Sequence, residues 1–207
     1  MAQYTKTASD AFEKLQMNAG IMVSSFTPAT GAIGDIVAAT TGGFSFASNP
    51  TYADFGEDVD NVPANTWQLK RVQSYDPVLS GTLLTVDNAL IKQLVGGAKY
   101  GVTGSGTTTT DDTHIIPKTE LAEADFNDVW FVCDYSDKNT GTGSGSSTYA
   151  GYIAIHIMNG FNTTGFQIKT TKNEKGQFAF EFHGHYDLED IDEVPFEIYI
   201  REGNVAS

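Results

Sequence analysis

The chain has 207 residues, 40% of them hydrophobic and 18% charged, which is the composition of a folded domain and not of a disordered chain. Its 26 acidic and 12 basic side chains give a formal charge of −14, which argues against binding along the phosphates of a nucleic acid. The first residues lack the apolar segment of a signal peptide, and no apolar run is long enough to span a bilayer. We therefore expect synthesis in a cytoplasm and no membrane insertion.

The N-terminal quarter is expected to begin with an arm, residues 1–20, that contains a short helix over 7–19. A strand is predicted over 21–26 and a second over 36–46, where the pair Gly42-Gly43 indicates a bulge.

Residues 49–65 are predicted to form a long loop, because the segment contains two prolines and is too long for a hairpin turn. It carries four acidic side chains and no basic one: Asp54, Glu57, Asp58 and Asp60. Clustered carboxylates suit Ca²⁺, but the spacing lacks the glycine and terminal glutamate of an EF-hand loop. A plain acidic surface loop is the favoured interpretation. Strands are predicted to follow over 66–75 and 78–86.

Residues 87–95 form the clearest predicted helix. Asp87 is a favourable N-cap, an apolar stripe follows it, and Gly96 and Gly97 end it. Because isolated helices shorter than about 12–15 residues are marginal in water, this helix must pack on a sheet.

Two segments rich in Gly, Ser and Thr, 101–113 and 137–149, are predicted to be flexible exposed loops. Between them, residues 128–135 are expected to form an apolar strand that buries Cys133 as a small hydrophobic side chain.

The C-terminal part is predicted to be a meander of strands over 151–158, 165–171, 176–186 and 194–200, with a hairpin turn at 173–176. Alternation in the third of these strands separates two faces. One face carries Phe178, Phe180, Phe182 and Tyr186, and the other carries Ala179, Glu181, His183 and His185. The expectation is a mainly β sandwich or barrel-like fold, one domain over 1–207, with one short helix packed on the sheet and long loops.

No motif of a known catalytic or cofactor site is present, and we expect neither an enzyme nor a bound cofactor. The best metal candidate is the pair His183 and His185, joined by His156 from a neighbouring strand. A metal-dependent enzyme built on these three histidines is one alternative, but a solvated or hydrogen-bonded pair is the favoured interpretation.

Several segments, in chain order, resemble the tail tube (major tail) proteins of long-tailed, non-contractile bacteriophages. They are FEKLQMNAG at 12–20, ATTGGF at 39–44, GEDVDNVP at 56–63, SGT at 80–82 with VD at 86–87, GQF at 176–178 and VPFEI at 194–198. The resemblance covers most of the chain and rests on the order of these patterns.

The resemblance implies a structural virion protein, made in the host bacterial cytoplasm, that assembles into hexameric rings stacked into a tail tube for genome delivery. In this family the long loop reaches the adjacent ring, which makes 49–65 the expected inter-ring loop, with contact candidates Tyr52, Asp54, Phe55, Glu57, Asp58 and Asp60. Glu181 is the candidate for lining the lumen, where carboxylates repel DNA that passes without specific binding.

The implied partners are further copies of the chain, a tape-measure protein, a tail terminator, and tail tip or baseplate proteins. A contractile tail, a tailocin or a gene-transfer particle shares the implied fold and remains an alternative. A β-sandwich adhesin or carbohydrate-binding module of a virion or cell surface is the alternative from another class.

Overall fold

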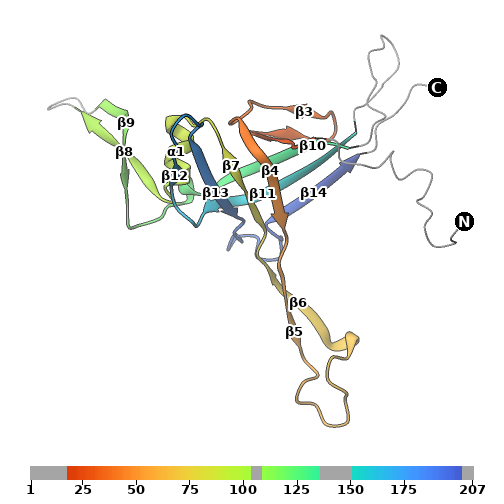
Figure 1. Cartoon of the computed structure of the whole chain (residues 1–207). Helices are drawn as coiled ribbons and strands as arrows, with labels where there is room; N and C mark the ends of the chain where they lie inside the picture. Colours follow the sequence, from red (N-terminus) through yellow and green to blue (C-terminus); the bar gives the residue numbers. More distant parts are fainter. Residues whose placement is uncertain (1–17, 104–108, 136–150, 202–207) are drawn as a thin grey trace, which may run out of the picture.

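The computed structural model describes residues 18–103, 109–135 and 151–201 (Figure 1). The described chain is mainly β, with one α-helix and a large antiparallel sheet, which confirms the predicted fold class. The predicted helix over 7–19 lies almost wholly outside the described residues, and the predicted loop over 137–149 lies entirely outside them.

One half of the large sheet has the strand order β1-β10-β11-β14. Its strands are β1 (Ile21–Val23), β10 (Asn127–Asp134), β11 (Tyr152–Asn162) and β14 (Phe196–Arg201). The strand β11 is longer than the predicted 151–158 and belongs to both halves of the sheet. Residues 152–157 pair with β10 and β14, whereas 161–162 pair with β13. Asn159, at a φ of 50°, marks the bend between these two stretches.

The other half has the order β4-β7-β13-β12. Its strands are β4 (Thr40–Ala47), β7 (Val78–Leu83), β13 (Gln177–His183) and β12 (Gln167–Lys169). Gly42 and Gly43 both have a φ of 77°, and the register between β4 and β7 shifts at them, so the predicted bulge is confirmed. The turn between β12 and β13 contains Asn173 at a φ of 63°, as expected for the predicted hairpin.

The main core lies between the two halves of the sheet. Leu79, Phe180 and Phe182 from the second half meet Phe131 and Ile157 from the first. The phenylalanine face predicted for β13 is therefore the core face. Cys133 is also buried here, as predicted.

The helix α1 (Asn88–Leu94) covers one end of this core. Asp87 caps it as predicted, because its Oδ1 accepts a hydrogen bond from the Leu90 N–H at 2.7 Å. Leu90 and Leu94 are buried in the core. The amide of the buried Asn162 donates to the Leu94 carbonyl at 2.6 Å, and its Oδ1 accepts from the Glu181 N–H at 2.9 Å, so one polar side chain links the helix to the sheet.

A small hairpin of β2 (Phe26–Thr27) and β3 (Ala32–Ile33) lies beside the first half of the sheet. Phe26 packs there with Val23, Val132, Tyr152 and Ala154 in a second apolar cluster. This cluster is built from the residues of β10 and β11 that alternate with those facing the main core.

The prediction of a flexible loop over 101–113 is wrong for its described part. β8 (Ala98–Thr103) and β9 (Thr109–Pro117) form an antiparallel hairpin, and only 104–108 lie outside the described residues. The threonines of this segment are good strand formers, and β8 supplies the partner that satisfies their backbone groups. The Gly and Thr content of this segment predicts a loop, and it gives no sign of the strand pairing that the structure contains.

Candidate interaction surfaces

A β-hairpin projects from the body of the molecule; we call residues 50–75 the arm (Figure 1). It consists of β5 (Pro50–Asp54), the tip, the short 3-10 helix η2 (Trp67–Leu69) and β6 (Lys70–Tyr75). The arm continues the paired strands β4 and β7. The prediction of a loop over 49–65 is wrong for residues 50–54, which form the strand β5. Pro50 is tolerated there because it occupies the first strand position, where a missing N–H costs no ladder hydrogen bond. The predicted strand over 66–75 begins later, at Lys70.

Contacts from β4, from β14 and from the segment after β13 hold the root of the arm. The Asp76 N–H donates to the Asn49 carbonyl at 3.2 Å, and the Tyr75 N–H donates to the Tyr186 hydroxyl at 2.9 Å. The ring of Phe196 lies 5.5 Å from that of Tyr75 and 5.6 Å from that of Phe46. These contacts fix the direction in which the arm leaves the sheet.

His183 adds a titratable contact at the same root. Its Nδ1 lies 2.7 Å from Asp76 Oδ1, and its Nε2 lies 3.0 Å from Glu181 Oε1. Partial burial lowers the pKa of the imidazole, but the hydrogen bonds and charges of the two carboxylates outweigh this effect. The pKa of His183 is therefore raised above its ordinary value of 6.5.

Asp54 organises the tip of the arm and does not face outward. Its two carboxylate oxygens accept hydrogen bonds from the N–H groups of Gly56 and Asn65, each at 2.9 Å. The hydroxyl of Thr66 donates to the Pro63 carbonyl at 2.6 Å. The tip is thus an ordered loop with its own internal hydrogen bonds.

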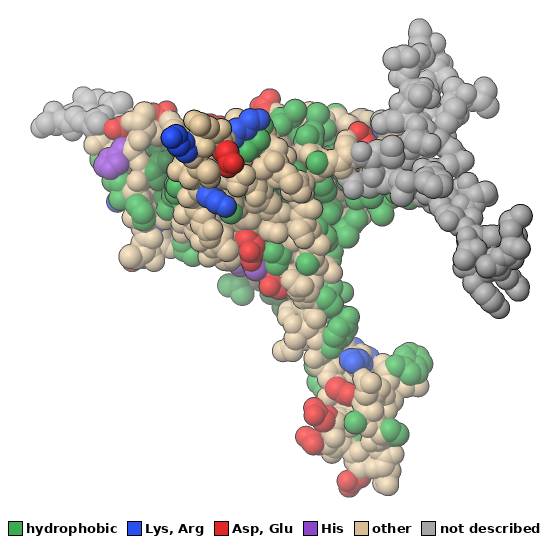
Figure 2. Space-filling model, in the orientation of Figure 1, with side chains coloured by type: hydrophobic (Ala, Val, Ile, Leu, Met, Phe, Trp, Pro, Cys, Tyr) green, Lys and Arg blue, Asp and Glu red, His purple; other side chains and the backbone are tan. Residues whose placement is uncertain are grey.

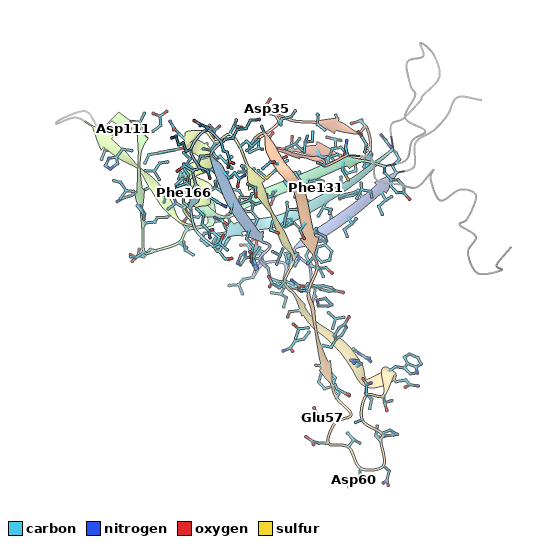
Figure 3. The ribbon with its side chains drawn as sticks, viewed as in Figure 1. Asp35, Glu57, Asp60, Asp111, Phe131 and Phe166 are labelled. Atoms are coloured by element: carbon cyan, nitrogen blue, oxygen red, sulfur yellow. The ribbon has the colours of Figure 1, made fainter. Side chains whose placement is uncertain are left out.

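The other contact candidates predicted from the sequence are exposed on the arm. Phe55 is 67% exposed and Tyr52 is 54% exposed. Within the described part of the chain, Glu57, Asp58 and Asp60 make no ion pair, and Figure 3 places Glu57 and Asp60 at the tip. Trp67, which the sequence reasoning missed, has 79% of its surface exposed, and Val59 and Val72 are also exposed. Figure 2 shows apolar and acidic side chains together on the tip.

Glu181 lies on the sheet face that points away from the main core. The strand register places it beside Ser80 of β7, which in turn lies beside Ser45 of β4. Thr82 and Ala179 occupy the next row of the same face. The same face also carries His183 of β13 and Gln167 and Lys169 of β12, so it combines small side chains with one carboxylate and two nitrogen bases.

The three candidate histidines have separate surroundings. The ring of His156 stacks on Trp130 with centroids 4.0 Å apart, whereas His185 Nδ1 lies 3.1 Å from the Asn159 carbonyl oxygen. His183 belongs to the root of the arm, as described above. No cluster of three or more histidine, cysteine or carboxylate side chains within the described ranges is arranged to hold a metal ion.

No protein-family model matches this chain, and no curated protein sequence shows significant similarity to it. Within the residues that the structure describes, no helix has the length and apolar character required to cross a membrane.

Proposed function

We propose that this chain is the subunit of a bacteriophage tail tube, which assembles into hexameric rings stacked into a conduit for genome delivery. The observation that carries the proposal is the arm, a β-hairpin that leaves the body and keeps large apolar side chains in water. The sequence resemblance implies an inter-ring loop at residues 49–65, which overlap the first part of the arm.

The physical argument starts from the exposed side chains. Trp67, Phe55, Tyr52, Val59 and Val72 belong to one projecting element, and each is at least 47% exposed. Burying a side chain of this kind stabilises a complex by about 1.5–3 kcal/mol. A group of such side chains marks an interaction surface, because folding of the single chain gains nothing from it.

The direction of the arm suits a stacked assembly. An arm that leaves one end of a subunit contacts a different surface on its neighbour, which is a head-to-tail contact. Such contacts do not close on a pair; they form a closed ring where the rotation closes and an open stack or filament where it does not. A tube made of stacked rings is one such assembly. The further partners of the proposed tube are a tape-measure protein, a terminator, and tail tip or baseplate proteins.

The polar sheet face is the surface proposed to line the lumen. It presents Glu181 among Ser45, Ser80 and Thr82, and the register also places His183 and Lys169 on this face. The formal charge of −14 adds to the repulsion of phosphates. This role is structural, and the proposal places the protein in the virion tail with no catalytic step.

The test is negative-stain electron microscopy of the concentrated full-length chain, with light scattering on the same samples. We expect rings or hollow tubes of uniform diameter. A matched variant without the arm, in which residues 50–75 are replaced by a short Gly-Ser turn between β4 and β7, is expected to fold and to form no tubes. Wild-type protein that stays monomeric at millimolar concentration contradicts the proposal.

The alternative function, an adhesin or carbohydrate-binding module, predicts a monomer with affinity for glycans. Its aromatic candidate is Trp67 of the arm, which is 79% exposed. The ring of Trp130 is a poorer platform for a sugar, because it is stacked on His156 and lies 5.7 Å from that of Phe26. Glycan-array binding by the monomer is the result that favours this alternative.

A further inference from the structure

Acidic side chains gather along the arm, where Lys70 and Arg71 at the start of β6 are the basic residues. The tip of the arm, residues 54–66, contains four acidic side chains and no basic one. Residues 187–193 add Asp187, Glu189, Asp190, Asp192 and Glu193, all exposed. This second acidic segment starts beside the root of the arm, where the Gly184 N–H donates to the Pro77 carbonyl at 3.0 Å.

The opposite end of the same sheet carries a basic segment. The lysine hairpin, which we define as β12, the start of β13 and the turn between them, contains Lys169, Lys172 and Lys175, with Glu174 as its one acid. All ten residues from 166 to 175 are exposed. None of the three lysines forms an ion pair within the described ranges, so the turn faces water with its charge uncompensated.

The strand register fixes these positions relative to the arm. His183 of β13 pairs with Val78, next to the arm root, whereas Phe178 pairs with Leu83 at the far end of β7. Lys169 pairs with Gln177, one residue beyond Phe178. The six residues of β7 therefore separate the arm root from the lysine hairpin by about 20 Å. Figure 3 likewise shows Phe166, just before β12, on the body and far from Glu57 and Asp60 at the tip.

The two ends also match in their apolar groups. The tip of the arm exposes Phe55 and Val59, and the lysine hairpin exposes Ile168, at 56%, and Phe166. Exposed apolar side chains thus lie near carboxylates at one end of the molecule and near ammonium groups at the other. Such an arrangement favours the correct partner and orientation through attraction of opposite charges and repulsion of like ones.

Resting on the proposed tube function, we infer that the arm tip of one copy docks on the lysine hairpin of a second copy. Glu57, Asp58 and Asp60 then face Lys169, Lys172 and Lys175, while Phe55 and Val59 cover Ile168. The five residues of β5 carry the tip about 17 Å beyond its root, which lets it reach a neighbour without overlap of the two bodies. The contact is head-to-tail and gives the stack one polarity.

Charge reversal at each end tests this contact. The variant Lys172→Glu/Lys175→Glu and the variant Glu57→Lys/Asp58→Lys each replace attraction by repulsion, and each is expected to raise the critical concentration for tube assembly by about tenfold or more. The chain that carries all four changes has the wild-type net charge and is expected to assemble like wild type. Lys92→Glu/Lys99→Glu is the matched control, since it makes the same charge change elsewhere and leaves both ends intact.

Zero-length carbodiimide cross-linking identifies the contact directly. Assembled protein is prepared from a mixture of ¹⁵N-labelled and unlabelled chains, so that links between copies carry both labels. We expect mixed-label peptides that join residues 57–60 to 169–175. If the tubes contain no such links, or if both charge-reversal variants assemble at the wild-type critical concentration, this contact is overturned and the tube function stands. Wild-type protein that forms neither rings nor tubes overturns the tube function and this contact with it.

Discussion

Trp67 offers the sharpest single test of the arm as an interaction surface. The indole is 79% exposed in the free chain, so about 200 Å² of it is available for burial by a partner. At about 25 cal/mol per Å², complete burial is worth up to ~5 kcal/mol, and burial of half the side chain is worth ~2.5 kcal/mol. Trp67→Ala is therefore expected to raise the critical concentration for assembly by roughly 50-fold.

The same exposure predicts that the free chain does not depend on this indole. The free energy of unfolding of Trp67→Ala should stay within about 0.5 kcal/mol of wild type. The control Trp67→Phe keeps much of the apolar area and should assemble at a concentration between the other two. Critical concentrations come from sedimentation of tubes across a dilution series, and stabilities come from urea unfolding. Unchanged assembly together with a large loss of stability refutes the reasoning, because the indole would then serve the fold.

The remaining predictions concern the root, the tip and the core. The pKa of His183 is raised in the folded state, so its contacts with two carboxylates stabilise the fold fully below pH 6.5, and this stabilisation is lost as pH rises through the folded pKa. In urea unfolding, the difference in stability between wild type and His183→Asn should therefore shrink from pH 6 to pH 8.5. A difference that does not change with pH contradicts the assignment. Asp54→Ala removes the acceptor of two backbone N–H groups, so their local opening free energy should fall by ~1–2 kcal/mol in hydrogen exchange; Asp54→Asn, which keeps one acceptor oxygen, should lose less. Leu79→Ala empties a fully buried site and should cost about 2.7–5 kcal/mol of unfolding free energy, against less than about 0.5 kcal/mol for the exposed Leu188→Ala; similar losses for both would show that the core is placed wrongly.

Local signals in the sequence determined several elements correctly. The helix α1 follows from Asp87 as cap and the paired glycines after Leu94, because capping acts within one turn of the backbone. The bulge at Gly42 and Gly43 follows from the freedom of glycine at positive φ. Side-chain alternation in β13 separated Phe180 and Phe182, which face the core, from Glu181, because successive residues of a strand point to opposite faces.

Pairing between distant segments was beyond the reach of these signals. The Gly, Ser and Thr content of residues 101–113 predicted a loop, whereas the pairing of β8 with β9 makes strands of the ends of this segment. The acidic loop was predicted, but its first residues became β5 because β6 offers a register of hydrogen bonds. Long-range pairing depends on the closure of the whole sheet, which no local pattern encodes.

The residues of the candidate surfaces also fall into two groups, those indicated by the sequence and those placed by strand pairing. Length, prolines and acidic side chains singled out residues 49–65, and the family resemblance implied an inter-ring contact there. Trp67 and Val72 joined the candidate surface only through the hairpin that exposes them. Nothing in the sequence pattern marks Lys169, Lys172 and Lys175 as part of an interaction surface. Only the antiparallel order of β7 and β13 sets them at the end of the sheet opposite the arm, because strand pairing converts positions far apart along the chain into a direction in space.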